Sequence, residues 1–493
     1  MLAHLIDNRL ITLHGLLVFT GLAIYVIGSR TRRQRRHPSA AVAWVVSLAL
    51  APEFALPLYL LFGNRKVARR ETAPQQVPTA VAAGAVPSVR DGPTLAFHQL
   101  ADAMGLPPPS HYHDLRIDAD GHQALTHLHE VLQHARQTLD VCTFLVGHDV
   151  FGRELTGLLA QRARAGVRVR LLVDGIGIYL GGRIDLRALR EAGVQAELFV
   201  SPLRSMLPGR TNLRNHRKLV IADGCRVWTG GRNLAAEYFV GDTTQLLPRQ
   251  AWIDLTFGFG GALAGQAQQR FDLDWTFATG RAQRDTPPVA GGGDGHESDD
   301  AGHDNGDVPR SSSAAVPTAR LIASGPDQHD DTLHVLLVSG CFSARRRIQA
   351  VSPYFVPDPV LLMALTLAAR RGVAVDLVLP RRSNHRLADW ARHASLRELT
   401  AAGGRVWLVP QMVHAKAMVI DDDLALVGSA NLDERSLFLN YELMVAFHDP
   451  LPVAGFADWT DRLREGAEVY RGDRPGVVRE MLEGLVRWLA FQL

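Results

Sequence analysis

The amino-acid sequence predicts an α/β protein in which two homologous lobes form one body behind an apolar N-terminal segment. One polar phrase occurs twice, around residue 216 and again around residue 414. Strand-like and helix-like patterns alternate around both copies, which is typical of layered α/β domains. With 493 residues, the chain is also longer than a single domain usually is. The sequence therefore indicates a duplicated unit with an added N-terminal part.

Residues 1–70 are predicted to form a membrane anchor of one or two helices. The stretch 10–28 is almost entirely apolar, and about 20 apolar residues are enough to cross a bilayer. No small-residue cleavage pattern follows it, which favours a retained anchor over a removed signal peptide. The stretch 40–62 is also apolar but is interrupted by Pro52 and Pro57.

Arginine-rich clusters follow both apolar stretches, at 30–36 and at 65–70. If both stretches crossed the membrane, these clusters would lie on opposite sides, which the positive-inside tendency disfavours. We therefore expect the second stretch to enter the membrane and return on the same side. The alternative is that both stretches form buried core helices.

Four further parts follow along the chain. Residues 71–92 are rich in Pro, Ala and Val and are predicted to be a tether, and residues 93–280 are predicted to be the first lobe. Residues 281–318 should be a disordered linker, because they contain too few large apolar residues to offset their ordering entropy. Residues 319–493 are predicted to be the second lobe. They end in a helix with an apolar face, which either docks on the core or contacts a membrane.

The two lobes repeat more than the polar phrase. Residues 162–175 match residues 368–381, and residues 189–199 match residues 399–409. Each match has the pattern of a helix end, a Gly and an apolar strand. This order predicts two α/β/α lobes with mostly parallel sheets, facing each other so that each catalytic strand lies at the seam.

The polar phrase carries the candidate chemistry. Its first copy is His216-x-Lys218-x4-Asp223, and its second copy is His414-x-Lys416-x4-Asp421. Both copies begin with a period-two pattern, which predicts a strand with His and Lys on one face. Glycine and asparagine follow both copies at the same distance, as Gly230, Gly231 and Asn233 in the first and as Gly428, Ser429 and Asn431 in the second. So regular a recurrence predicts two equivalent His–Lys sets.

These phrases resemble the double HxKxxxxD signature of the phospholipase D superfamily. Residues 214–238, 413–442 and 352–358 are similar to the motifs of the bacterial cardiolipin synthases within it. The resemblance covers nearly the whole chain apart from the tether and the linker. It implies two phospholipase D-like α/β/α lobes that form one catalytic body.

The activity that the resemblance implies is cardiolipin synthesis. A phosphatidyl group would pass from one phosphatidylglycerol to another through a phosphohistidine, giving cardiolipin and glycerol, and phosphatidylethanolamine is an alternative donor. The main alternative is a membrane-bound phospholipase D that hydrolyses phospholipid to phosphatidic acid. An endonuclease and an inactive lipid-binding scaffold are weaker alternatives. By the superfamily's pattern, His216 is the nucleophile and His414 is the general acid/base.

A phosphodiester is a crowded anion, so its catalyst must neutralise charge and supply both a nucleophile and an acid. Lys218 and Lys416 offer fixed positive charges for the nonbridging oxygens. Asn233 and Asn431 offer amide hydrogen bonds to the same oxygens. Ser429 adds a hydroxyl near the phosphate in the second copy alone.

Four acids accompany the histidines. Asp223 and Asp421 complete the motifs, but each follows an apolar strand and leads into a turn, so we expect them to fix the turn. Asp254 and Glu442 lie on the next strand-like runs, where members of the superfamily carry an acid. They are predicted to orient the imidazoles through the far ring nitrogen. The alternative for both is a solvated acid at the end of a strand.

Composition excludes several other classes of function. The net charge of +3 does not indicate a nucleic-acid binder. No His, Cys or acidic residues show metal-ligand spacing, so neither a metal nor another cofactor is expected. The predicted partners are phosphatidylglycerol, other phospholipids and a membrane, and the oligomeric state is open. The predicted location is the bacterial inner membrane, with the catalytic body facing the cytoplasm.

Overall fold

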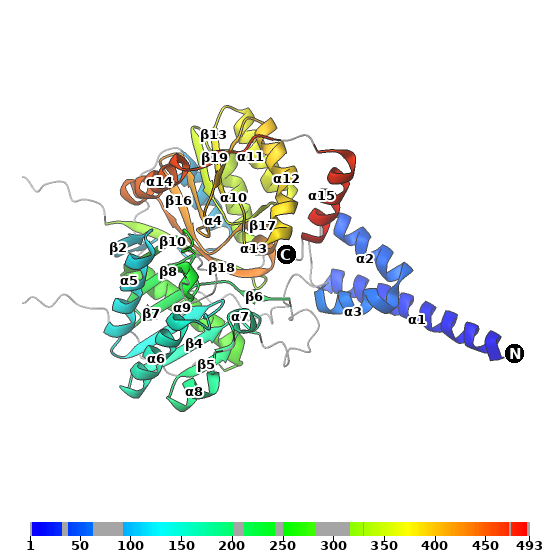
Figure 1. The fold of residues 1–493 in the computed structure, drawn as a ribbon, viewed down its shortest axis with the longest axis horizontal. Coiled ribbons are helices and arrows are strands. Elements are labelled where there is room, and N and C mark those ends of the chain that lie inside the picture. The colour runs from blue at the N-terminus through cyan, green and yellow to red at the C-terminus, as the bar shows by residue number, and fades with distance from the viewer. Residues whose placement is uncertain are drawn as a thin grey trace, which may run out of the picture.

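The computed structural model describes residues 2–31, 38–62, 92–182, 184–200, 212–241, 250–281, 316–328, 330–472 and 475–490 (Figure 1). Almost all of the predicted tether (71–92) and linker (281–318) lies outside these residues. Both therefore stay predictions.

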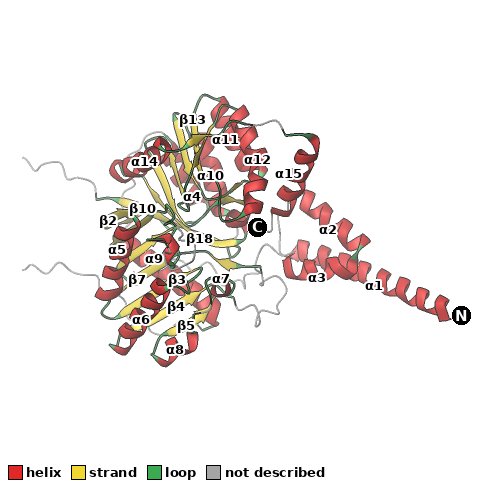
Figure 2. Cartoon of the chain, viewed as in Figure 1, coloured by secondary structure: helices red, strands yellow, loops and turns green. Residues whose placement is uncertain are grey.

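The body of the protein consists of two lobes, each built on one β-sheet with helices packed on it (Figure 2). The first lobe contains β2 (His113–Asp118), α5 (Gly121–His134), β3 (Thr138–Thr143), α6 (Val150–Arg164), β4 (Arg168–Val173), α7 (Gly177–Leu180), α8 (Leu186–Glu191), β5 (Gln195–Leu198), β6 (Arg214–Asn215), β7 (Leu219–Ala222), β8 (Arg226–Gly230), η1 (Ala236–Tyr238), β9 (Thr256–Gly260) and α9 (Ala262–Thr279). The second lobe contains β10 (Thr318–Ser324), α10 (Thr332–Ser343), β11 (Arg347–Val351), β12 (Phe355–Val356), α11 (Pro359–Arg370), β13 (Ala374–Pro380), α12 (Arg386–Ala401), β14 (Arg405–Val409), β15 (Ala417–Ile420), β16 (Leu424–Gly428), β17 (Leu432–Asp433), α13 (Glu434–Phe438), β18 (Asn440–Phe447), α14 (Pro450–Glu465), β19 (Glu468–Val469) and α15 (Val477–Ala490).

The two sheets repeat one strand order. In the first lobe the order is β2-β9-β8-β7-β3-β4-β5, and in the second it is β10-β18-β16-β15-β11-β13-β14. The second sheet is extended at its edges by β1 (Ser110–His111) and β19. Strand by strand, the topology confirms that the two lobes are copies of one α/β unit.

The prediction of mostly parallel sheets is wrong, because both sheets are mixed. The neighbours β3–β4–β5 and β11–β13–β14 are parallel. The strands that carry and follow the motifs pair antiparallel instead, as β7–β8 and β15–β16 do. The connections explain this difference: the short turns at Asp223 and Asp421 leave no room for a crossover helix and close hairpins.

Two helices lie between the sheets and join the lobes into one body. Helix α9 contacts strands of both sheets, and α14 packs on the second sheet and approaches β2 of the first. One hydrophobic cluster runs through this layer; among its members, the ring of Phe257 in the first lobe lies 5.6 Å from that of Phe447 in the second. Removing such surface from water stabilises the lobes together rather than one at a time.

The segment that opens the body crosses from one lobe to the other. Helix α4 (Pro93–Ala103) and strand β1 lie in the range predicted for the first lobe. Nevertheless, Phe97 and Ala101 of α4 are buried in the same cluster as α10 of the second lobe, and β1 pairs with β10.

Three helices precede the body and project from it in Figure 1: α1 (Leu2–Thr31), α2 (Pro38–Leu50) and α3 (Pro52–Phe62). They pack on one another through the rings of Tyr25, Trp44 and Tyr59. The second predicted stretch is thus two helices, which are separated by Ala51. In the part of the chain that the structure describes, no helix combines the length and apolar character that a membrane span needs.

Candidate active site

The two motif segments lie at the seam, and each is bound to the other lobe. Strand β6, just before His216, pairs with the start of β18, and the His216 N–H donates to the carbonyl of Tyr441 at 2.9 Å. In the same way Val413 bridges to Ile253, and the His414 N–H donates to the carbonyl of Ile253 at 2.7 Å. Main-chain bonds across the seam therefore position both histidines.

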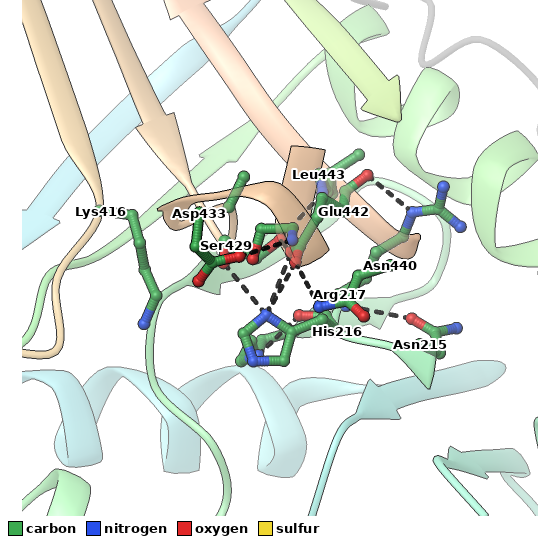
Figure 3. A network of polar contacts seen from close by, with 12 residues as sticks. Asn215, His216, Arg217, Lys416, Ser429, Asp433, Asn440, Glu442 and Leu443 are labelled. Atoms are coloured by element: carbon green, nitrogen blue, oxygen red, sulfur yellow. Dashed lines mark hydrogen bonds and ion pairs between the residues drawn. The ribbon is translucent and has the colours of Figure 1, made fainter. Parts of the chain in front are cut away.

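Each imidazole also binds a carboxylate of the opposite lobe. His216 Nδ1 lies 3.1 Å from Glu442 Oε2. Figure 3 shows the two side chains facing each other. His414 Nδ1 lies 2.7 Å from Asp254 Oδ2. Both acids are completely buried, so each carboxylate fixes the Nδ1–H tautomer and leaves Nε2 as the unprotonated ring nitrogen. The acids predicted to orient the imidazoles are therefore brought to them in a crossed arrangement.

The lysines lie beside the histidines. Lys218 Nζ donates to the His216 carbonyl at 2.6 Å, and Lys416 Nζ lies 3.0 Å from His414 Nε2. Burial, and then the charge of Lys416, lowers the pKa of Lys218 to about 7. Burial likewise lowers the pKa of Lys416 to about 8. The effect of the Lys416 charge on Lys218 is consistent with the two sets lying close together in a poorly hydrated space.

Burial and the neighbouring charges also shift the pKa values of the histidines and of the acids that bind them. Burial, followed by the charge of Lys416, lowers the pKa of His414 to about 3, and burial also lowers the pKa of His216. Burial alone would raise the pKa of Asp254, but His414 and Lys416 outweigh it and bring the pKa to about 2. The site therefore combines neutral imidazoles with ionised carboxylates at neutral pH.

The predicted phosphate-binding side chains lie around this space. The Asn233 amide donates to the Tyr238 hydroxyl at 2.8 Å, and Asn431 contacts Asp433. The Ser429 hydroxyl donates to Glu442 Oε2 at 2.6 Å, so in this structure it supports the carboxylate that holds His216 (Figure 3). The roles of these three residues towards a phosphate stay predictions.

Asp223 and Asp421 are not brought to the site. The Asp223 carboxylate accepts the backbone N–H groups of residues 136–138 at 2.7–2.9 Å. The Asp421 carboxylate accepts those of residues 345–347 at 2.8–3.0 Å. Both aspartates have φ 53°, a left-handed conformation that Asp tolerates better than most residues. They close the hairpin turns, away from the imidazoles.

Several neighbours of the imidazoles were not predicted from the sequence. The rings of Tyr238 and Trp252 lie 4.9 and 5.5 Å from that of His414, and Phe144 lies 5.5 Å from His216. Asn440 donates to Glu442 Oε1 at 3.2 Å. Trp252 stands two residues before Asp254, and Asn440 stands two residues before Glu442. Their matching positions in the two copies could have marked them as neighbours of the site. Phe144 had none, because it follows a strand far from either motif.

Comparisons with known proteins agree with this arrangement. A family model described as "Cardiolipin synthase, PLD-like domain" matches residues 128–275 and 341–464. Cardiolipin synthase A of Pseudomonas putida (strain W619) is 31% identical over 420 residues, covering 83% of this chain and 82% of its own. Cardiolipin synthase A of Pseudomonas aeruginosa (strain LESB58) is 31% identical over 444 residues, covering 87% and 84%.

A solved structure shows the same fold. Phosphatidylserine synthase of Haemophilus influenzae Rd KW20 superposes with a TM-score of 0.58 at 13% identity, covering 81% of this chain and all of its own. The duplicated lobes, the paired motifs and the extent of these matches lead to one conclusion. The chain belongs to the cardiolipin synthase family of the phospholipase D superfamily.

Proposed function

We propose that this protein is a cardiolipin synthase that transfers a phosphatidyl group from one phosphatidylglycerol to a second one. The observation that carries the proposal is the single buried site in which both His–Lys sets meet. Lys416 is close enough to lower the pKa values of Lys218, His216 and His414. One phosphodiester bound there would contact both sets at once.

The first half-reaction uses both histidines in opposite roles. His216 Nε2 attacks phosphorus, and the bond from phosphorus to the glycerol headgroup oxygen breaks. His414 gives that oxygen its proton, so glycerol leaves and a phosphatidyl-histidine remains. Binding of the anionic phosphodiester favours the charged forms of His414 and the lysines, because an opposite charge nearby raises their pKa values. The assignment of His216 as nucleophile follows the pattern of the superfamily.

The second half-reaction reverses these roles. His414 accepts a proton from the terminal hydroxyl of a second phosphatidylglycerol, whose oxygen attacks phosphorus. The bond from phosphorus to His216 breaks, and cardiolipin is released. Lys218, Lys416, Asn233 and Asn431 would stabilise the charge on the nonbridging oxygens throughout. Asp254 and Glu442 keep Nδ1 of each ring occupied, so that Nε2 alone reacts.

The setting proposed for this reaction is a bacterial inner membrane, with helices α1–α3 associated with the bilayer and the body on the cytoplasmic side. Phosphatidylglycerol is then both donor and acceptor. The support for this setting comes from the similarity to cardiolipin synthases A over most of the chain. It also comes from the apolar composition of the N-terminal helices.

The experiment is an incubation of the purified full-length chain with radiolabelled phosphatidylglycerol in detergent micelles. Cardiolipin and glycerol in equal amounts support the proposal, whereas phosphatidic acid identifies a hydrolase. His216→Ala should abolish turnover and the phosphoenzyme trapped by denaturation at alkaline pH, where a phosphohistidine is stable. His414→Ala should slow both the formation and the breakdown of the phosphoenzyme, because His414 acts in both half-reactions. His113→Ala, an exposed histidine of β2, is the matched control and should keep full activity. Turnover that survives His216→Ala but not His414→Ala would reverse the two roles.

A further inference from the structure

An exposed patch of basic and apolar side chains lies where β13 passes into α12. The patch, called the rim patch below, consists of Arg382, His385, Arg386, Leu387 and Trp390, all exposed to solvent. Leu387 is 54% exposed and Trp390 is 48% exposed, although both are large apolar residues. A soluble surface rarely gathers such residues beside arginines without a partner.

The rim patch adjoins the active site through Tyr354. The Tyr354 hydroxyl donates to Asn384 at 2.6 Å, and its ring lies 5.4 Å from that of His385. Burial, and then the charge of Asp433 in the site, raises the pKa of Tyr354. Tyr354 also lies near Tyr238, whose ring contacts His414. The rim patch is therefore part of the edge of the catalytic space.

Helix α15 adds a second apolar surface with an unusual orientation. Its residue Glu483 is 1% exposed and binds Arg397 at 2.5 Å and Arg479 at 2.8 Å, whereas its other acid, Glu480, is exposed. The side turned to solvent, called the α15 outer face, carries Val477, Val478, Met481 and Leu482, which are 46–74% exposed. A helix that docks on a soluble core buries its apolar side, so this orientation indicates an apolar partner outside the body.

Both surfaces belong to one region. Helix α15 packs along α12, and Val486 of α15 packs with Ala391 of α12, one residue beyond the rim patch. Figure 1 shows α12 and α15 on the side of the body from which α1–α3 project. The N-terminal helices expose apolar side chains of their own, among them Phe19 and Phe54.

We propose that the rim patch and the α15 outer face form the surface on which the body docks on an anionic phospholipid bilayer, beside the entrance to the active site. Arginine with tryptophan and leucine suits the interface of such a bilayer: the guanidinium groups meet lipid phosphates, and the apolar side chains enter the acyl boundary. The identity of the lipid as substrate rests on the proposed function, but the docking itself does not.

The test uses the full-length chain with its exposed cysteine removed by Cys225→Ser, since Cys142 and Cys341 are buried. A polarity-sensitive fluorophore is attached to Leu387→Cys or to Met481→Cys, and to Leu451→Cys as control. Leu451 is 87% exposed on α14. In nanodiscs that contain phosphatidylglycerol, the first two labels should shift to the blue and be quenched by brominated acyl chains. The control label should stay in water, and pure phosphatidylcholine should weaken the first two signals.

The outcomes separate docking from catalysis. Blue-shifted labels without cardiolipin would support docking and contradict the proposed function. Labels that stay in water while cardiolipin forms would overturn docking and leave the proposed function intact. A blue shift in detergent without nanodiscs, growing with protein concentration, would mean that a second copy of the chain covers this surface, and would also overturn the proposal.

A kinetic measurement tests the contribution of charge. Each basic side chain near an anionic surface strengthens association about fivefold. Arg382→Gln and Arg386→Gln together should therefore raise the apparent KM for phosphatidylglycerol in nanodiscs by at least about tenfold more than for dispersed short-chain phosphatidylglycerol. The control is Arg346→Gln, at a 62% exposed arginine paired with Asp422. It should leave the apparent KM unchanged for both forms of phosphatidylglycerol. Equal changes on both substrates would contradict docking through these arginines.

Discussion

At the residue scale, the two halves of the active site differ where the motifs differ. Ser429 supports Glu442, and its counterpart is Gly231. A Cβ atom at Gly231 would lie 2.1 Å from Asp254 Oδ1, so no side chain fits there while Asp254 holds His414. The glycine in one copy and the serine in the other are therefore each matched to the carboxylate beside them.

Gly231→Ser should displace Asp254 and loosen His414 without unfolding the protein. We expect kcat to fall by about 10²- to 10⁴-fold, because a carboxylate that holds a catalytic imidazole in one tautomer contributes up to about 10⁴-fold. The measurement is kcat together with the thermal midpoint. Gly265→Ser, in α9 with open space around the glycine, is the matched control. Unchanged kcat in Gly231→Ser would show that the Asp254–His414 contact is dispensable.

The lysines predict an alkaline limit to activity in the free enzyme. Their pKa values are lowered to about 7 for Lys218 and about 8 for Lys416, so a rise in pH through this range removes the positive charges. We therefore expect kcat/KM to fall above about pH 7, where Lys218 begins to lose its proton, and kcat to fall at higher pH because bound phosphate holds the protons. The acid limb should lie below pH 6.5, since the pKa of His216 is lowered from that value. A kcat/KM that is flat up to about pH 10 would contradict this.

At the scale of elements, the motif aspartates act on hairpins rather than on the reaction. Asp223→Ala and Asp421→Ala should each lower the free energy of unfolding by about 2–4 kcal/mol, because backbone N–H groups lose their acceptor and Ala disfavours φ 53°. Denaturant titration measures this. Asp422→Ala, beside Asp421 but 52% exposed, should cost about 0–1 kcal/mol. A catalytic role would instead lower kcat at unchanged stability.

Some elements could be predicted from the sequence and others could not. The duplicated lobes were readable from their matched helix ends. The prediction that each motif His and Lys lies on a strand is wrong, because β7 begins only at Leu219 and β15 only at Ala417, and the segments before them are held by the opposite lobe instead. The antiparallel pairing of β7 with β8 was missed, although Asp223-Gly224 is a hairpin signal. Helix α4 precedes the first lobe in the chain but packs on the second. No local sequence pattern predicts this, because it depends on contacts with α10.

At the scale of the whole molecule, the site exists only between the lobes. The sequence indicated Asp254 and Glu442 as orienting acids, but it could not show which histidine each one contacts. Those partners are 160 and 226 residues away in the chain. Such pairing follows from the way the two sheets face each other through α9 and α14, and no local pattern records it.

This arrangement predicts how the chain behaves when it is divided. A backbone cut between residues 281 and 316 should leave two fragments that are each inactive, since each holds a histidine without its carboxylate. Co-expression should restore most of the turnover, because one hydrophobic cluster and α4 hold the fragments together. Phosphatidyl transfer by the purified fragments and by the pair is the measurement, with the uncut chain as reference. Activity in a lone fragment would refute the crossed site.

The crossed contacts also bear on the synthesis of this protein on the ribosome. When the first lobe emerges, His216 has no Glu442 to hold it, and Asp254 has no imidazole to bind. Under the proposed function, a nascent chain beside a membrane is therefore unable to cleave the lipids around it. The site becomes complete only after β18, which carries Glu442, has been translated, so synthesis of most of the polypeptide has to precede activity.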